Sequence, residues 1–365
     1  MRRVLPLAVS LSGLVVFTGC AEGEAVRVDP PTAGSGGSTR PAKAEGAFAK
    51  EGWFGGPDGL HARIAIKGVE RRGAKSLLRY SVTSLDSSAK SVTFAIGLLD
   101  PVGRRLYKPT GSTSGDGFAP GTTREMAAEY PAIPQDVPMV TALTPGTAGE
   151  FTGIPVTGTG AGNAPTSPTR PTGAGQPGGN PAVLYDVVED GSGDDDPSGS
   201  PSASAGSPSA ATSSGGAGAP ADFRPEDGKT VASRSARFGE AKRRLDVKPF
   251  YRDGAYIVAV FDIVNQGPGP TPDNASYTHK DHPGGVYTAF SIQVPGRKDV
   301  YRAVRIGQAR PGRPASYVGS TSAAFRTAVN EPVRGFAYIP APPGKTSSVT
   351  FTGGAFGKVE DVPVK

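Results

Sequence analysis

The sequence feature that most constrains the fold is an internal repeat of short, alternating apolar runs. The segment "RIAIKGVERRGAKSLLRYSVTS" at residues 63–84 aligns without a gap on "RLDVKPFYRDGAYIVAVFDIVN" at residues 244–265. A glycine lies near the centre of each segment, Gly73 in the first and Gly254 in the second, where a tight turn would require positive φ. The alignment therefore predicts the same β-hairpin twice in one chain.

Two further segments repeat in the same order. The run "VTFAIGLLDPVGRRLY" from Val92 aligns with "VYTAFSIQVPGRKDVY" from Val286, and residues 130–156 align with 338–364, which places Tyr130 on Tyr338. The offsets between the copies are 181, 194 and 208, so the second copy carries two insertions. Both insertions fall between expected strands, where added loop length costs little free energy.

The fold class follows from these runs. They are rich in Val, Ile, Phe and Tyr and are separated by Gly, Pro and Asp, and no long stretch has the apolar period of an amphipathic helix. We expect an all-β protein with two tandem immunoglobulin-like antiparallel β-sandwich domains of about seven strands each. A small β-barrel is the alternative.

Composition sets the domain boundaries. The chain has 52 glycines and 36 prolines, about a quarter of its 365 residues, and they concentrate at 21–50 and 157–235. Such segments bury too little apolar surface to offset chain entropy. We therefore expect a disordered tether, a first domain at 51–156, a long disordered Gly/Pro/Ser/Thr-rich linker, and a second domain at 236–365.

The single cysteine predicts where the protein is held. Arg2 and Arg3 precede an apolar stretch that is too short and too interrupted for a transmembrane helix, and the stretch ends in Phe-Thr-Gly-Cys at Cys20. This layout resembles a bacterial lipoprotein signal peptide at 1–20, which implies diacylglycerol on the Cys20 sulfur. We expect a lipid-anchored protein at the extracytoplasmic face of the cell membrane; a plain secreted protein is the alternative.

The segments "LLRYSVTS", "DPVGRRLY" and "VPMVTALTPGTAGEFTGIPV" resemble those of actinobacterial lipoproteins with immunoglobulin-like extracellular domains of the DUF4352 kind. The resemblance covers the first domain directly and the second through the repeat. Some relatives continue into a peptidoglycan-binding OmpA-like domain, and no segment of this chain resembles its motif. The resemblance implies no catalytic residues.

Charge is divided unevenly along the chain. Residues 234–365 hold 19 Lys and Arg against 10 Asp and Glu, whereas residues 157–233 hold 3 against 9. A solvated, solubilising face is one interpretation, and contact with an anionic surface is the other. The candidate contact residues of the second domain are Arg297, Lys298, Arg302, Arg305, Arg310 and Arg313. Outside the cell, the possible partners are the membrane itself, anionic wall polymer, lipid head groups or another envelope protein; nucleic acid is not expected.

Two histidines lie close together in "DNASYTHKDHPGG". His279 and His282, with Asp281 between them and Asp273 nearby, could bind zinc or copper through neutral imidazoles. A polar surface loop is the alternative, because His-x-x-His spacing identifies a metal site only where the backbone geometry is fixed. Other enzyme motifs are missing from the sequence. We therefore expect no catalytic residues and no cofactor: a non-enzymatic envelope lipoprotein for binding or scaffolding, with metal binding at the histidine loop as the alternative function.

Overall fold

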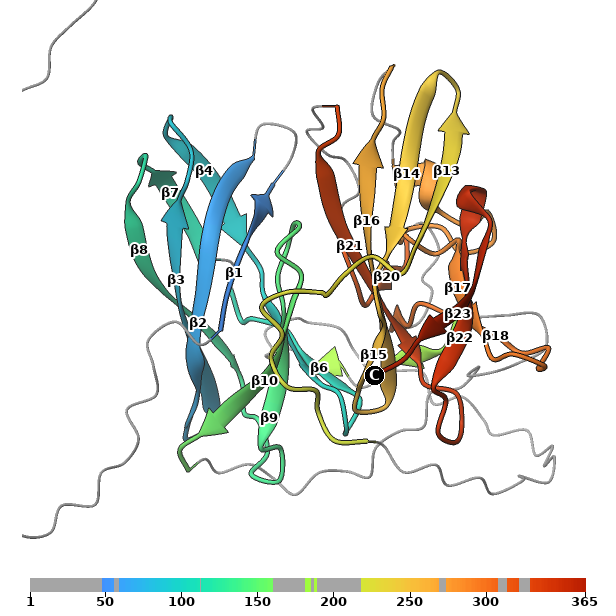
Figure 1. Ribbon diagram of the computed structural model, residues 1–365. Helices are drawn as coiled ribbons and strands as arrows, with labels where there is room; N and C mark the ends of the chain where they lie inside the picture. The colour runs from blue at the N-terminus through green and yellow to red at the C-terminus, as the bar shows by residue number, and fades with distance from the viewer. Residues whose placement is uncertain are drawn as a thin grey trace, which may run out of the picture. The chain divides into compact units, whose positions relative to one another are not determined.

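The described part of the chain is almost entirely β-structure. The computed structural model describes residues 48–55, 59–111, 113–159, 181–184, 187–188, 218–268, 274–307, 314–321 and 329–365. Within these ranges the only helical elements are two short 3-10 turns (Figure 1). The all-β prediction is confirmed. Residues Ala44–Lys365 form one compact unit, in which two regions correspond to the two sequence copies; we call them the first repeat (48–159) and the second repeat (232–365).

The described residues of the first repeat form ten strands. They are β1 (Phe48–Phe54), β2 (Leu60–Arg72), β3 (Lys75–Ser84), β4 (Lys90–Phe94), β5 (Gly97–Asp100), β6 (Arg105–Tyr107), β7 (Thr113–Phe118), β8 (Thr123–Pro131), β9 (Met139–Leu143) and β10 (Glu150–Thr157). Strands β1, β2, β3 and β8 lie side by side as one antiparallel group, and β6, β5, β9 and β10 form another. The parallel pairing of β10 with β2 joins the two groups into one sheet. Strands β4 and β7 pair separately.

Two short strands, β11 (Val183–Leu184) and β12 (Val187–Val188), separate the repeats along the chain. The second repeat contains β13 (Ala232–Phe238), β14 (Ala241–Val247), β15 (Tyr251–Asp253), β16 (Tyr256–Asn265), η1 (Asn274–Tyr277), β17 (Phe290–Gln293), β18 (Val300–Arg302), β19 (Arg305–Ile306), β20 (Ser316–Tyr317), β21 (Pro332–Pro340), β22 (Ser348–Gly353), η2 (Gly354–Phe356) and β23 (Lys358–Pro363). Its described strands form a five-stranded sheet of β13, β14, β16, β15 and β21 and a four-stranded sheet of β18, β17, β22 and β23. Strands β19 and β20 form a third sheet with β11.

The hairpin predicted from the first alignment is confirmed in register. Ile64 pairs with Val82 in the first repeat, and Leu245 pairs with Ile263 in the second; both residues of the pair are shifted by the same offset of 181. The turn glycines also agree, since Gly73 has φ 60° and Gly254 has φ 57°. Leu98 pairs with Tyr107 and Ile292 with Tyr301, which confirms the offset of 194 for the next pair of strands.

Irregularities of the backbone repeat as well. Strand β10 bulges between Phe151 and Ile154, and β23 pairs with β22 through an equivalent irregularity. At matching places in these bulges, Gly153 has φ 66° and Asp361 has φ 55°, because the extra residue of a bulge can require a left-handed backbone. The register and the bulges together show that the two copies share one β-framework.

The third alignment is wrong by one residue over its first strands. Glu129 pairs with Leu77, and Tyr338 pairs with Val258, so Tyr338 is the counterpart of Glu129 and Tyr130 corresponds to Ile339. A shift of one residue along a strand moves every side chain to the opposite face. The tyrosines that identity alignment placed together therefore point in opposite directions: Tyr130 enters the core of its repeat, whereas Tyr338 belongs to a different cluster.

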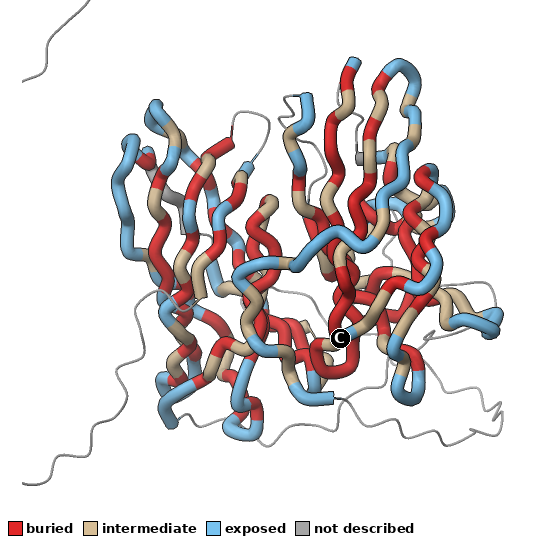
Figure 2. Tube along the Cα trace, in the orientation of Figure 1, coloured by how far each residue is buried: buried red, intermediate tan, exposed pale blue. Residues whose placement is uncertain are grey.

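Each repeat has its own apolar core. In the first repeat, Ile64 and Tyr80 pack with Val140 and Phe151, and in the second, Leu245 and Phe261 pack with Phe351. Figure 2 shows buried stretches running along the strands of both repeats, with exposed residues at many of the turns.

Part of the predicted linker is ordered. Within 157–235, which we expected to be disordered, β11 pairs with β19, β12 pairs with β6, and the end of the segment enters β13. Ala182 and Leu184 are each 1% exposed. The expectation fails at these positions because the short apolar run "PAVLYDVV" supplies the buried surface that its Gly/Pro-rich surroundings lack. The predicted tether at 21–50 also includes the first three residues of β1, 48–50, which are ordered. Residues 21–47, 160–180, 185–186 and 189–217 lie outside the described residues.

Candidate functional site

The histidine loop follows the η1 turn. The rings of His279 and His282 stack with centroids 4.9 Å apart, and His279 Nδ1 accepts a hydrogen bond from the backbone amide of Asp281 at 3.2 Å. The Asp281 carboxylate lies 3.7 Å from the same nitrogen. The structure thus brings together the three residues predicted as ligands, while Asp273 lies outside the described residues. Among the residues described, no group of three or more His, Cys, Asp or Glu has a spacing that could hold a metal ion.

Both imidazoles have lowered pKa values, which favour the neutral form. Burial and the nearby Arg302 guanidinium lower the pKa of His279. Burial, His279 and Arg302 lower the pKa of His282. Neutral imidazole is the form that ligates a metal, but a neighbouring guanidinium opposes the arrival of a cation.

The basic residues predicted as an anionic-surface contact differ in their surroundings. Arg297 and Lys298 are exposed in the turn between β17 and β18, whereas Arg302 is partly buried and donates to the Thr288 carbonyl at 3.3 Å. Arg305 lies in β19, where its backbone amide donates to the Ala182 carbonyl at 2.8 Å. Arg310 and Arg313, like Cys20, lie outside the described residues.

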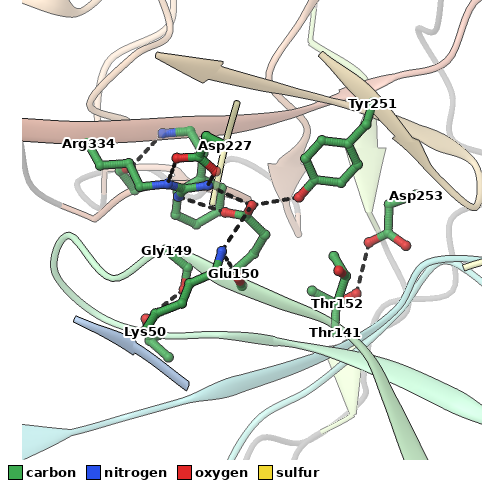
Figure 3. Close-up of polar contacts among 12 residues, drawn as sticks. Lys50, Thr141, Gly149, Glu150, Thr152, Asp227, Tyr251, Asp253 and Arg334 are labelled. Atoms are coloured by element: carbon green, nitrogen blue, oxygen red, sulfur yellow. Dashed lines mark hydrogen bonds and ion pairs between the residues drawn. The ribbon is translucent and has the colours of Figure 1, made fainter. Parts of the chain in front are cut away.

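A second polar site, which the sequence analysis did not identify, lies where the repeats meet (Figure 3). We call Lys50, Glu150, Asp227, Tyr251 and Arg334 the seam cluster. The Arg334 guanidinium donates to both carboxylate oxygens of Glu150, at 2.9 Å from Nη1 and 2.8 Å from Nη2. It also donates to Asp227, at 2.6 Å from Nη2 to Oδ1 and through Nε to Oδ2. One guanidinium therefore bridges two carboxylates.

Two more donors complete the coordination of Glu150. The Tyr251 hydroxyl donates to Glu150 Oε1 at 2.6 Å, and Lys50 Nζ donates to the Glu150 backbone carbonyl at 2.8 Å and lies 3.8 Å from Oε1. Glu150 comes from β10 of the first repeat, whereas Tyr251 and Arg334 come from β15 and β21 of the second. The side chain of Glu150 is only 2% exposed, so these contacts replace its hydration.

The titration of the seam cluster follows from this geometry. Burial by itself would raise the pKa of Glu150, but the charges of Arg334 and Lys50 lower that pKa to about 2. Burial lowers the pKa of Lys50, and the charge of Glu150 opposes the shift. Burial and the adjacent Glu150 carboxylate raise the pKa of the Tyr251 hydroxyl, which therefore remains a donor. Removing one member of such a buried set leaves its partners uncompensated, at a cost of about 3–5 kcal/mol.

A neighbouring carboxylate extends the polar contacts. Asp253 is fully buried and accepts hydrogen bonds from Thr141 Oγ1 of the first repeat at 2.8 Å and from the Tyr338 hydroxyl at 2.9 Å. The backbone amide of Ala221 donates to its other oxygen at 2.9 Å. Burial raises the pKa of Asp253, and the three donors oppose that shift.

Apolar residues from both repeats pack around these polar groups. We call this set the shared core; it comprises Leu99, Leu106, Ala182, Leu184, Tyr251, Ala255, Tyr256, Val258, Val260, Val304, Val318, Phe336 and Tyr338. The backbone amide of Ala255 also donates to the carbonyl of Pro101 in the first repeat, at 2.8 Å. Gly254 is required at this approach, since a Cβ there would lie 2.3 Å from the same carbonyl oxygen.

One signal in the sequence could have identified this interface. The run "AYIVAVFDIV" is apolar on both of its alternating sets of positions, which is typical of a strand covered on both faces. Its counterpart "AKSLLRYSVT" alternates with polar residues. The individual partners of Glu150 could not be inferred, because Arg334 is distant in sequence and nothing in its neighbours indicates the contact.

The comparisons with known proteins place no constraint on this site. No family model matches the chain, and no curated protein matches it. Among the described residues, no helix is both long and apolar enough to cross a bilayer. The charged groups of the seam cluster hydrogen-bond to one another, and these contacts join the two repeats.

Proposed function

We propose that this chain is a non-enzymatic cell-envelope lipoprotein that presents two immunoglobulin-like β-sandwich domains for binding or scaffolding at the outer face of the cytoplasmic membrane. The observation that carries the proposal is the seam cluster. Its buried charges join the repeats through Glu150 and Arg334, so both repeats are presented together on the tether that follows Cys20. The segment that resembles a lipoprotein signal peptide indicates where the chain is held; a β-fold alone would indicate no function.

Binding rather than catalysis is favoured by how the titratable groups are used. Glu150 and Asp253 accept hydrogen bonds from fixed donors on both repeats, which stabilises one arrangement of the chain. The exposed Arg297 and Lys298 turn remains available to an anionic wall polymer or lipid head group.

The anchor is tested by labelling cells that express the full chain with a palmitate analogue. Wild type should incorporate the label and sediment with membranes, whereas Cys20→Ser should do neither. Thr18→Ser is the matched control, because it alters the same segment and keeps the thiol. Sedimentation of Cys20→Ser with membranes would contradict the anchor.

Binding of the chain to anionic vesicles should weaken with added salt.

Metal binding is the second candidate function, and the stacked, neutral His279 and His282 rings favour it. Titration calorimetry with zinc should then give one site that His279→Ala abolishes. His61→Ala is the control, because His61 pairs with Glu51 in the first repeat. Equal zinc binding by the two variants would contradict a site at the histidine loop.

A further inference from the structure

The hairpin of β13 and β14 places two positive charges directly opposite each other. Arg237 pairs in register with Lys242, so both side chains lie on the same face of the hairpin. This face is the outward one, because the alternate residues Leu245 and Val247 enter the core of the second repeat. Arg237 is exposed and Lys242 is half-buried, near the exposed turn of the hairpin (Figure 2). We call Arg237 and Lys242 the opposed pair; like charges in this arrangement destabilise a sheet.

Among the described residues, no carboxylate forms an ion pair with the opposed pair. Two acidic side chains lie on the same face, but each is paired with another cation. Asp246 Oδ1 lies 2.7 Å from Arg244 Nε. Asp262 Oδ2 lies 2.9 Å from Lys248 Nζ. Glu240 occupies the turn and forms no ion pair within the described part of the chain. The positive charge of the opposed pair is therefore left uncompensated by these groups.

A side-chain amide lies beside the opposed pair. The backbone amide of Gln266 donates to the Lys242 carbonyl at 3.0 Å, which places Gln266 next to Lys242 on the neighbouring strand. The Ser235 hydroxyl donates to Gln266 Oε1 at 3.1 Å, so the Nε2 amide group of Gln266 is left to donate. Guanidinium and ammonium groups are donors only. The face therefore presents N–H donors from three neighbouring side chains, a set that suits an anion.

The first repeat shows that the shared framework does not require this charge. In register, Trp53 and His61 occupy the positions of the opposed pair, and Glu51 occupies the position of Ser235. The rings of Trp53 and His61 stack with centroids 4.3 Å apart, and Glu51 Oε1 lies 3.1 Å from His61 Nε2. The second repeat thus has two cations in place of an aromatic pair, and a hydroxyl in place of the neutralising carboxylate.

We propose that the outward face of the β13–β14 hairpin binds the phosphodiester groups of an anionic polymer through Arg237, Lys242 and the Gln266 amide. Phosphate oxygens can accept hydrogen bonds from both cations, and a guanidinium can donate two to one phosphate. Basic segments that bind a bilayer surface contain clusters of about 4–8 Lys and Arg, whereas two uncompensated cations match a single polymer strand. This inference rests on the proposed binding function, to which it adds a site and a ligand class, and is independent of the lipid anchor.

The test measures binding of a fluorescein-labelled oligomer of glycerol phosphate to the full chain by fluorescence anisotropy. The double variant Arg237→Gln, Lys242→Gln should bind the oligomer at least about tenfold more weakly than wild type at low salt. Its affinity should also depend less steeply on salt concentration, because two phosphate contacts are lost. The matched control is Arg297→Gln, Lys298→Gln, which removes the same charge from the exposed turn between β17 and β18 and should weaken binding less.

A further variant keeps both cations and adds the acid of the first repeat. Ser235→Glu places a carboxylate where Glu51 neutralises His61, so it should weaken oligomer binding several-fold. The same carboxylate relieves the repulsion within the opposed pair, so the midpoint of urea denaturation should rise. A purely structural role of the hairpin would not combine a gain in stability with a loss of binding.

Equal affinity of wild type and the hairpin double variant would overturn the site. Equal losses in the two double variants would also overturn it, because attraction would then follow net charge. Tighter binding of polyglutamate than of the oligomer would overturn the phosphodiester as the ligand. Displacement of the oligomer by soluble short-chain phosphatidylglycerol, equally well per phosphate, would overturn the polymer in favour of a lipid head group.

Failure of this site can be distinguished from failure of the proposed function. If only Arg297→Gln, Lys298→Gln loses affinity, the contact proposed for that turn stands and the hairpin site is overturned. The labelling of Cys20 does not depend on any of these outcomes.

Discussion

Strands β3 and β16 occupy equivalent positions in the two repeats, but the outward face of β3 is exposed whereas that of β16 is buried. On the outward side of the first repeat, Lys75 and Glu129 form an exposed ion pair at 2.9 Å. The corresponding positions of the second repeat are Tyr256 and Tyr338, which are almost fully buried in the shared core. The inward-facing residues of the two strands therefore preserve the register, whereas the outward-facing residues determine whether a strand is exposed or packs against the other repeat.

The two repeats also bury different faces. The seam joins the β9–β10 side of the first repeat to the β16–β21 side of the second, so the contact is between unlike faces. Away from the seam, Lys75 and Arg79 of the first repeat and Lys358 and Glu360 of β23 are exposed.

The largest expected effect comes from removing the central carboxylate. Glu150→Ala leaves Arg334 and Lys50 without their buried partner and should lower the free energy of unfolding by about 3–5 kcal/mol in urea denaturation. Glu129→Ala removes an exposed ion pair of the first repeat and should cost at most about 1 kcal/mol. Equal losses in the two variants would show that the seam is not buried.

A smaller effect should distinguish the outward faces of β3 and β16. Arg79 and Val260 are equivalent in register, and Val260 is 1% exposed whereas Arg79 is exposed. Val260→Ala removes buried apolar contacts and should cost about 1–3 kcal/mol. Arg79→Ala should change stability by no more than about 0.5 kcal/mol. Chemical denaturation of the two variants measures this difference in the free energy of unfolding. Equal losses would show that the outward face of β16 is exposed.

The smallest effect concerns pH at the seam. Burial raises the pKa of Asp253, so the folded state favours the protonated carboxyl. The stabilisation that results is present at low pH and is lost as the pH rises through the folded-state pKa. Asp253→Asn should lie within about 1 kcal/mol of wild type at pH 7. The variant should become less stable relative to wild type as the pH is lowered from 7 toward 4.

The pKa of Glu150 is lowered to about 2, so its contribution to the free energy of unfolding has the opposite pH dependence and is lost as the pH falls. This loss occurs in wild type and in Asp253→Asn alike. The difference between the unfolding curves of wild type and Asp253→Asn therefore isolates Asp253. A difference that is independent of pH would contradict the shifted pKa.

The framework of each repeat could be predicted from the sequence, but the seam could not. Gapless matching of residues 63–84 on 244–265 gave the correct pairing of Ile64 with Val82 and Leu245 with Ile263, because inward apolar residues and turn glycines are local signals. Matching Tyr130 to Tyr338 failed by one position, since residue identity does not report which face of a strand a side chain occupies. The contacts of Glu150 with Arg334 depend on packing between distant segments. Strands β11 and β12 could not be predicted, because the composition of the residues around them is typical of disorder.

The first repeat covers the outward face of β16 and β21. Hydroxyl-radical footprinting of the full chain tests this directly, because the rate at which a tyrosine is oxidised reports the exposure of its ring. Tyr256 and Tyr338, 1% and 0% exposed, should be oxidised as slowly as the core residue Tyr80. Oxidation of both at the rate of exposed aromatic side chains would contradict a covered face.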